Sequence, residues 1–248
     1  MRSSNPTLAD NTFSGFGYED AKTESMTIPG TIYKTTLLLL LVLLSAGWVW
    51  MKFHNAGGNT AVVTPWMTGG VIGGLVLAIA TVFKKEWAPI TAPLYALFEG
   101  LFIGGISAML DATYPGIVMQ AAGLTFGTLF TMMAAYSSGL IRATEKFKIG
   151  VIAATGGIAL VYVASMILGF FGVQIPGIFG NGLIGIGFSL FVVIIAALNF
   201  IIDFDFIEQG ANRGVPKFME WYGAFAMMVT LIWLYIEFLR LLSKTRER

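Results

Sequence analysis

The chain has 248 residues, a net charge of +1 at pH 7 and a composition that is 56% hydrophobic and only 12% charged. Soluble domains carry about 25% charged residues, so a soluble fold is excluded, and the apolar content also excludes a disordered chain. The small net charge provides no field for nucleic acid, and the absence of cysteine excludes disulfides and thiolate metal sites. The composition therefore predicts an integral membrane protein that contacts the lipid bilayer.

Long stretches without charge predict the membrane-spanning helices, because about 20 apolar residues cross the hydrocarbon core as a helix. In chain order these stretches are 35–51, 65–83, 87–110 with the single charge of Glu99, 112–141, two crossings within 149–202, and 219–242. The two crossings within 149–202 are separated near Gln174, Pro176 and Asn181. The sequence thus predicts an all-α integral membrane protein with seven transmembrane helices in one bundle.

The predicted domain organisation has three parts. Residues 1–34 form a polar N-terminal tail, too long and too weakly basic for the start of a secretory signal peptide, 35–242 form the transmembrane domain, and 243–248 form a basic C-terminal tail. The positive-inside rule favours a cytoplasmic N-terminal tail, and a re-entrant segment over 203–216 would bring the C-terminus to the same side. Glycines three or four residues apart, such as Gly100 and Gly104, are typical of close helix packing in lipid.

Ionisable residues inside the predicted spans are few, and nearly all lie in the last fifth of the chain. Burying one in a membrane costs about 2.5 to 3.5 kcal/mol even on mild scales, so each needs a partner or a role. Glu99 has no cation within a turn of its own helix, and we expect it to be protonated or paired with another helix. Glu220, beside Trp221 and Tyr222, is interpreted as an interfacial anchor.

Three carboxylates, Asp203, Asp205 and Glu208, fall within six residues at the end of the sixth predicted span. On a helix Asp203 and Asp205 are about 200° apart, so one can point into the bundle while the other faces the rim. The alternative is that the helix ends near Ile202 and all three side chains are solvated.

In the last span, Glu237 follows a long apolar stretch and precedes Arg240 by one helical turn. It either pairs with Arg240 on its own helix or lies opposite a carboxylate of the preceding helix. Two carboxylates in a medium of low dielectric constant do not both ionise easily, so such a pair would share a proton and act as a pH switch.

These acidic segments resemble a known family. The pattern Asp203-x-Asp205-x-Ile207 resembles the Asp-Thr-Gln-x-Ile motif of the transmembrane Bax inhibitor motif family, and the run 234–242 resembles its Leu-Tyr-Leu-Asp pattern, with Glu237 at the acid. The stretch 92–106 is similar to the family's third helix. The opening Arg2-Ser-Ser-Asn-Pro and the run 219–225 look like a bacterial branch of the family.

The resemblance implies a seven-helix fold with the last helix central, and a pH-sensitive calcium leak governed by an aspartate pair. By position, Asp203 matches the first aspartate and Glu237 replaces the second, so these two would bind calcium transiently. Asp205 adds an acid where the family usually has glutamine. Some relatives latch the pair with an arginine of the second helix; the candidate cations here are Lys84 and Lys85, at the end of that span, and Arg240.

The first functional hypothesis is a calcium leak channel or transporter of the bacterial cytoplasmic membrane, gated by protonation of Asp203, Asp205 and Glu237, with Glu99 on the ion path. Calcium would be the transported ion, and no cofactor is expected. The alternative is a non-conducting regulator whose tail binds a membrane protease or another membrane partner. Intramembrane aspartyl proteolysis also needs two acids, but Asp203 lacks the Gly-x-Gly-Asp context, so we do not expect an enzyme.

Overall fold

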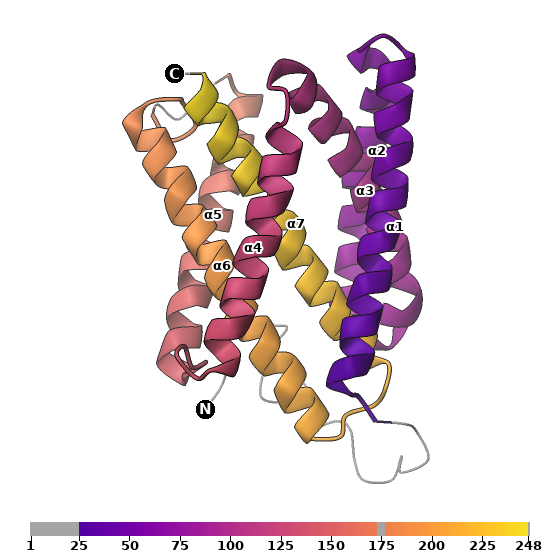
Figure 1. Ribbon diagram of the computed structural model, residues 1–248, viewed down its shortest axis with the longest axis vertical. Helices are drawn as coiled ribbons and strands as arrows, with labels where there is room; N and C mark the ends of the chain where they lie inside the picture. The colour runs from indigo at the N-terminus through magenta and orange to yellow at the C-terminus, as the bar shows by residue number, and fades with distance from the viewer. Residues whose placement is uncertain (1–24, 173–176, 248) are drawn as a thin grey trace. The chain divides into compact units, whose positions relative to one another are not determined.

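The computed structural model describes residues 25–172 and 177–247, which contain seven long helices and one short 3₁₀ turn, η3 (Lys85–Trp87) (Figure 1). The helices are α1 (Ile28–Asn55), α2 (Thr60–Phe83), α3 (Ala88–Thr113), α4 (Ile117–Ser137), α5 (Glu145–Phe170), α6 (Leu183–Asn212) and α7 (Met219–Arg246). All seven are long and apolar enough to cross a membrane. Within the described ranges there is no strand, only an isolated β-bridge between Ser25 and Pro216. The predicted all-α class with seven spans is confirmed.

Side-chain caps explain where several helices begin. The first N–H groups of a helix have no partner within it, and an oxygen-bearing side chain just before the helix can accept from one of them. Thr27 accepts from the Gly30 N–H at 3.0 Å at the start of α1, and Asn59 accepts from the Ala61 N–H at 3.0 Å at the start of α2. Helix α1 therefore begins at Ile28, before the boundary at residue 35 that the charge pattern suggests.

The acidic segment of α6 is helical to its end at Asn212, and the chain turns only between Asn212 and Met219. The alternative interpretation, a helix that ends near Ile202, is therefore wrong, and residues 203–212 do not form a re-entrant segment. The break between α5 and α6 lies between Phe170 and Leu183 and includes Asn181, as expected; Gln174 and Pro176 lie outside the described residues.

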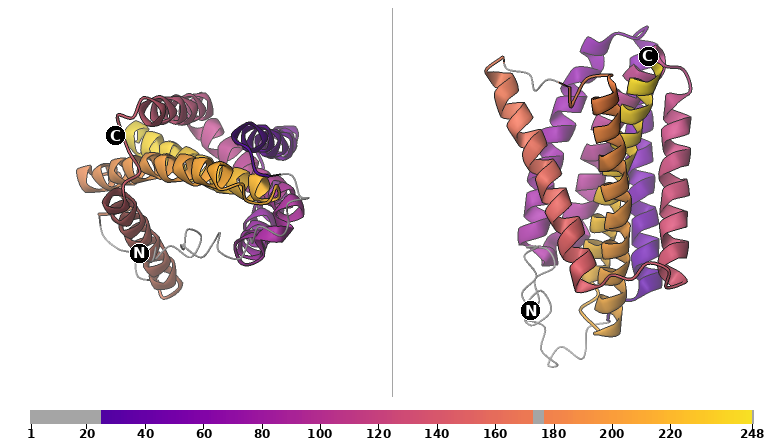
Figure 2. Two further views of the ribbon diagram at one scale, coloured as in Figure 1. Left: turned by 90° about the horizontal axis from the view of Figure 1, so that it is seen from below. Right: turned by 90° about the vertical axis from the view of Figure 1, so that its left-hand side faces the viewer.

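The helices divide into two compact units. The chain passes from one unit to the other at three places, one between α3 and α4, one inside α6 and one inside α7. The first unit comprises Met1–Pro115 and Asp205–Val229, and the second comprises Gly116–Phe204 and Thr230–Arg248. Within the first unit α3 packs against both α1 and α2, as Figures 1 and 2 show in indigo and purple. An apolar cluster of Val49, Phe53, Val63 and Ala108 joins these three helices. The central position expected for the last helix concerns the whole bundle and stays a prediction.

Within the second unit, α5, α6 and α7 share an apolar cluster. Its buried members are Ile158, Val192 and Ile195, and Tyr162 and Trp233 pack against them. The second-unit segments of α6 and α7 run side by side in both views of Figure 2 (orange and yellow), and contacts at both ends of this pairing agree. This pairing positions the polar groups described below.

Glycine lets α3 approach α1 closely. A Cβ atom at Gly104 would lie 2.6 Å from the Cα atom of Ala46, and one at Gly100 would lie 3.0 Å from the Cα atom of Val42. Both neighbours are backbone atoms, which cannot turn away as a side chain can. The spacing of these two glycines therefore serves helix packing, as the sequence indicates.

We expect Gly104→Ala to lower the free energy of unfolding by about 1 to 3 kcal/mol, because overpacking forces backbone shifts. Gly123→Ala in α4 is the matched control, because no atom lies within 4 Å of a Cβ at that position. Both substitutions gain the same helix propensity, so their difference isolates the contact. Thermal unfolding of the purified variants in detergent measures it, and equal melting temperatures would contradict the close packing.

Candidate functional site

Three polar residues of α7, Thr230, Glu237 and Lys244, are spaced seven residues apart and form the polar column of α7. Seven residues make almost two helical turns, so the three lie on one face with a drift of about 20° per step and are separated by roughly 10 Å along the axis. All three are buried, with exposed fractions of 7%, 1% and 4%. Each contacts another segment of the second unit.

At the first step of the column, Asp203 of α6 accepts a hydrogen bond at 2.6 Å from the hydroxyl of Thr230. One turn before Asp203, the amide of Asn199 donates to the hydroxyl of Thr155 on α5 at 2.9 Å and to the Ile195 carbonyl at 2.8 Å. Asp203 thus points toward α7, and neutral polar groups link α5, α6 and α7 near it.

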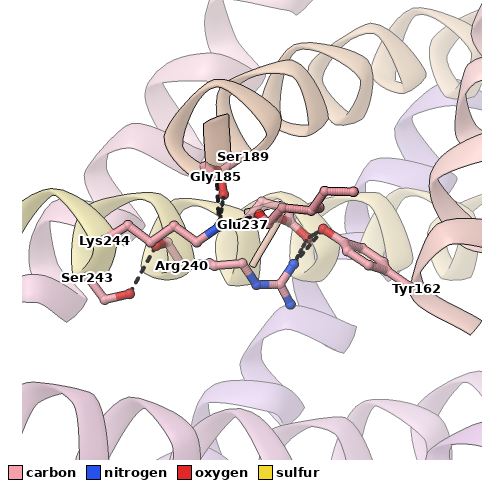
Figure 3. Close-up of polar contacts among 8 residues, drawn as sticks. Tyr162, Gly185, Ser189, Glu237, Arg240, Ser243 and Lys244 are labelled. Atoms are coloured by element: carbon pink, nitrogen blue, oxygen red, sulfur yellow. Dashed lines mark hydrogen bonds and ion pairs between the residues drawn. The ribbon is translucent and has the colours of Figure 1, made fainter. Parts of the chain in front are cut away.

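At the second step, Oε1 of Glu237 accepts from the Tyr162 hydroxyl at 2.8 Å and from the Arg240 guanidinium at 2.8 Å (Figure 3). The guanidinium also donates to the Tyr162 hydroxyl and lies 4.9 Å from the centre of that ring. Glu237 therefore pairs with Arg240 on its own helix, the first of the two alternatives. Its other oxygen, Oε2, is buried and has no hydrogen-bond partner among the described residues.

At the third step, the ammonium of Lys244 donates to the hydroxyl of Ser189 at 2.9 Å and to the carbonyls of Gly185 at 3.0 Å and Ile178 at 3.3 Å. From the sequence, Lys244 belonged to a basic tail. Helix α7 instead continues to Arg246, and the lysine points into the second unit.

The contacts at the two ends of the column fix how α6 and α7 align. Fourteen residues separate Asp203 from Ser189 on α6, and fourteen separate Thr230 from Lys244 on α7. Glu237 lies midway on α7, so it is level with the midpoint of the α6 segment, Ala196, and about two turns from Asp203. The two carboxylates have separate partners in this structure, and proton sharing between them stays a prediction.

The other predicted ion-path acid, Glu99, lies in the first unit on α3. It shares a side-chain hydrogen bond with Tyr95 one turn earlier. A Cβ atom at Gly74 of α2 would lie 2.9 Å from Glu99 Oε1, so this carboxylate lies against α2. The glycine at that position leaves room for it.

The remaining candidates also belong to the first unit. Asp205 accepts a hydrogen bond from the amide of Gln209 one turn later. Lys84 caps the end of α2 and is exposed, and the Lys85 ammonium lies 5.5 Å from the centre of the Tyr222 ring. A latch between one of these lysines and the acids of the second unit stays a prediction.

Glu220 is the residue whose environment the sequence did not indicate. It is fully buried, forms an ion pair with Lys34, and accepts from the N–H of Thr27 at 2.9 Å and from its hydroxyl at 2.8 Å. A side chain at Gly30 would collide with the carboxylate. Glu220 thus ties the segment before α1 to the start of α7, and its interpretation as an interfacial anchor stays a prediction.

Acidic metal ligands do not gather in the part of the chain that the structure describes. In residues 25–172 and 177–247 there is no group of three or more His, Cys, Asp or Glu side chains able to hold a metal ion. Transient calcium binding by Asp203 and Glu237, expected for a transported ion, stays a prediction.

A family model described as Bax inhibitor 1 like matches residues 5–247, nearly the whole chain. No curated protein and no solved structure matches the chain. The match extends over both units, so it includes the polar column of α7 and also Glu220 with its partners Thr27 and Lys34.

The buried pair of Glu220 and Lys34 gives a stability prediction. We expect Glu220→Gln to lower the free energy of unfolding by on the order of 3 kcal/mol, because it leaves Lys34 without a counter-charge in a buried site. Glu145→Gln is the matched control, since that carboxylate is 64% exposed and 3.7 Å from Lys148, and surface pairs contribute about 1 kcal/mol or less. Denaturant unfolding compares them, and similar losses would mean that the Glu220 pair is not buried in solution.

Proposed function

Because the chain belongs to the Bax inhibitor 1-like family, we propose that it is a pH-sensitive calcium leak pathway of the bacterial cytoplasmic membrane. The chain is a multi-pass integral membrane protein, so the proposal concerns what passes through it and what controls the passage. One observation carries it: Glu237 is buried in an apolar helix with one oxygen bound to Arg240 and Tyr162 and the other without a partner.

This half-paired carboxylate supplies the proposed gate. Protonation removes the charge that holds Arg240, and the arginine side chain, 34% exposed, can then turn away from the carboxylate. The link from α7 to Tyr162 on α5 weakens, so acidification loosens the contact between these helices. The groups bonded to the carboxylate are Tyr162 of α5 and Arg240 of α7, and Lys244 lies one step of the polar column further along α7.

The acids of the spans supply oxygen ligands for the ion. Calcium prefers carboxylate and carbonyl oxygens, and charged side chains along a pore select cations. Asp203 and Glu237 are about two turns apart in the second unit, and Glu99 lies within a span of the first unit. In this proposal each of the three carboxylates binds a passing calcium ion briefly, and none holds it permanently.

A second candidate function, a non-conducting regulator, is favoured by how the segment before α1 is attached. The N–H of Met26 donates to the Val215 carbonyl at 2.7 Å, and Thr27 binds Glu220. The preceding residues 1–24 lie outside the described residues. Under this second proposal a membrane protease or another partner binds residues 1–24, next to the attached segment.

Calcium flux into liposomes that contain only this protein tests the leak. We expect wild-type flux to rise several-fold from mildly alkaline to mildly acidic pH. Glu237→Gln mimics the protonated side chain, so its flux should be high at every pH. The control is Glu208→Gln, which removes an exposed carboxylate of α6, and we expect its calcium flux to respond to pH as wild type does. Glu220→Gln is unsuitable as a control because we expect it to lower stability.

Asp203→Asn separates proton sharing from a gate at Glu237 alone. If the calcium flux of Asp203→Asn no longer responds to pH, a proton shared by Asp203 and Glu237 is supported. If the flux of this variant keeps the wild-type pH profile, the shared proton is contradicted and Glu237 alone is the sensor. Absence of flux at every pH would rule out the leak. The regulator then predicts a membrane partner that co-purifies with the whole chain and is lost when residues 1–24 are deleted.

Glu99 has its own test. If it lines the ion path, Glu99→Gln should change the amplitude of calcium flux several-fold without moving its pH midpoint, because an amide attracts cations less than a carboxylate does. Glu86→Gln is the control, since Glu86 is exposed in the turn before α3. Wild-type flux in Glu99→Gln would return Glu99 to a packing role against Gly74.

A further inference from the structure

The environment of Lys244 is unusual for a buried lysine. Its ammonium points from α7 to the start of α6, where it meets the hydroxyl of Ser189 and the carbonyl of Gly185 (Figure 3). The Ile178 carbonyl, in the connection between α5 and α6, is the third acceptor. An ammonium has three donors, so these three oxygens satisfy it completely.

All three acceptors are neutral. Buried charges are normally paired with an opposite charge, but within the described ranges no carboxylate forms an ion pair with Lys244. Glu237 is one step of the polar column away, about 10 Å along the helix axis, and Glu247, three residues after Lys244, accepts from the amide of Asn181. The cation is therefore held by backbone and hydroxyl oxygens alone, as dehydrated monovalent cations are held in carbonyl-lined filters.

The backbone is shaped to bring these oxygens together. A Cβ atom at Gly185 would collide with the carbonyl of Gly180 and lie 3.0 Å from that of Gly177. Gly177 itself has a φ of 85°, a conformation that glycine adopts most readily. The connection thus folds closely over the first turn of α6, and this fold places the Ile178 carbonyl beside those of the helix.

We propose that Ile178, Gly185 and Ser189 form a monovalent-cation site that the Lys244 ammonium occupies as a tethered cation, closing one end of the polar column. Neutral ligands favour K⁺, NH₄⁺ or a primary alkylammonium over calcium, which prefers several carboxylates. The cation site is inferred from the contacts of Lys244 alone. Its role in blocking ion passage rests on the proposed leak function. With the ammonium in place, the next cation on the column meets a fixed positive charge.

Thermal unfolding tests the site without any flux. We expect Lys244→Ala to melt several degrees below wild type in N-methylglucamine chloride. At equal ionic strength, KCl, NH₄Cl or butylammonium chloride should recover at least half of that loss, because these cations refill the oxygen cage. Wild type, and the control Lys52→Ala, in which the altered lysine lies over the Trp48 ring, should melt alike in every salt.

Two results of this measurement would overturn the cation site. One is an equal melting temperature of Lys244→Ala in all four salts, which would make Lys244 only a tie between α7 and the α5–α6 connection. The other is the same salt response in Lys52→Ala, which would show a general effect of the salts. If Lys244→Ala does not fold, Lys244→Met takes its place in the same comparison with butylammonium omitted, since methionine fills the space of the lysine stem and leaves the oxygens to K⁺ or NH₄⁺.

Flux tests the closure. In liposomes we expect Lys244→Met to pass calcium and potassium several-fold faster than wild type. Ser189→Ala, which removes one ligand, should pass them faster than Ser243→Ala, whose hydroxyl donates to the Arg240 carbonyl on its own helix. Wild-type conduction with no increase in Lys244→Met or Ser189→Ala would overturn the closure. No flux in any variant would overturn the leak and the closure together, whereas the salt-dependent melting still decides the cation site.

Discussion

The cost of burying charge in an apolar environment organises the second unit. Each charged group on the inner face of α7 has to be neutralised locally, because neither lipid nor the apolar cluster around Ile195 and Trp233 can solvate it. Two different sets of partners neutralise or solvate the charges along this face of α7. Glu237 is matched by a cation and a hydroxyl, and Lys244 is matched by neutral oxygens only. The seven-residue spacing keeps both on the face that looks toward α5 and α6.

The first unit also contains a buried charge, Glu220, whose partners come from another segment of the chain. Glu220 sits in the first turn of α7, and its partners Thr27 and Lys34 come from the beginning of α1. Both oxygens of this carboxylate accept from a donor of α1 or of the residue before it. Such a cluster fixes two chain segments far apart in sequence, and it contains no unpartnered oxygen. The Glu220 contacts therefore suit a fixed attachment of α1 to α7, whereas Glu237, with one oxygen unpartnered, suits a group that changes its protonation state.

The sequence predicts the spans well because charge is nearly absent from them. It gives the Glu237–Arg240 pair as one of two alternatives, because the two residues lie one turn apart. It could not identify Tyr162, since a single tyrosine in a charge-free stretch gives no sign of its partner 75 residues later. Lys244 was assigned to a tail because its charge ended the hydropathy pattern, although three oxygens of α6 and its preceding connection receive it. The separation of Asp203 from Glu237 was also hidden, because it depends on the alignment of α6 against α7.

The two cations of the polar column differ in a way that limits what protonation of Glu237 can achieve. Arg240 is one-third exposed and held mainly by Glu237, so it can leave when that carboxylate is neutral. Lys244 is buried and has all three of its donors satisfied by groups that do not titrate, so the same event does not release it. At an effective dielectric constant of about 20, a charge roughly 10 Å away still contributes on the order of 1 to 2 kcal/mol. Under the proposed function, acidification therefore removes one barrier and leaves the other, which favours a slow leak over a freely open channel.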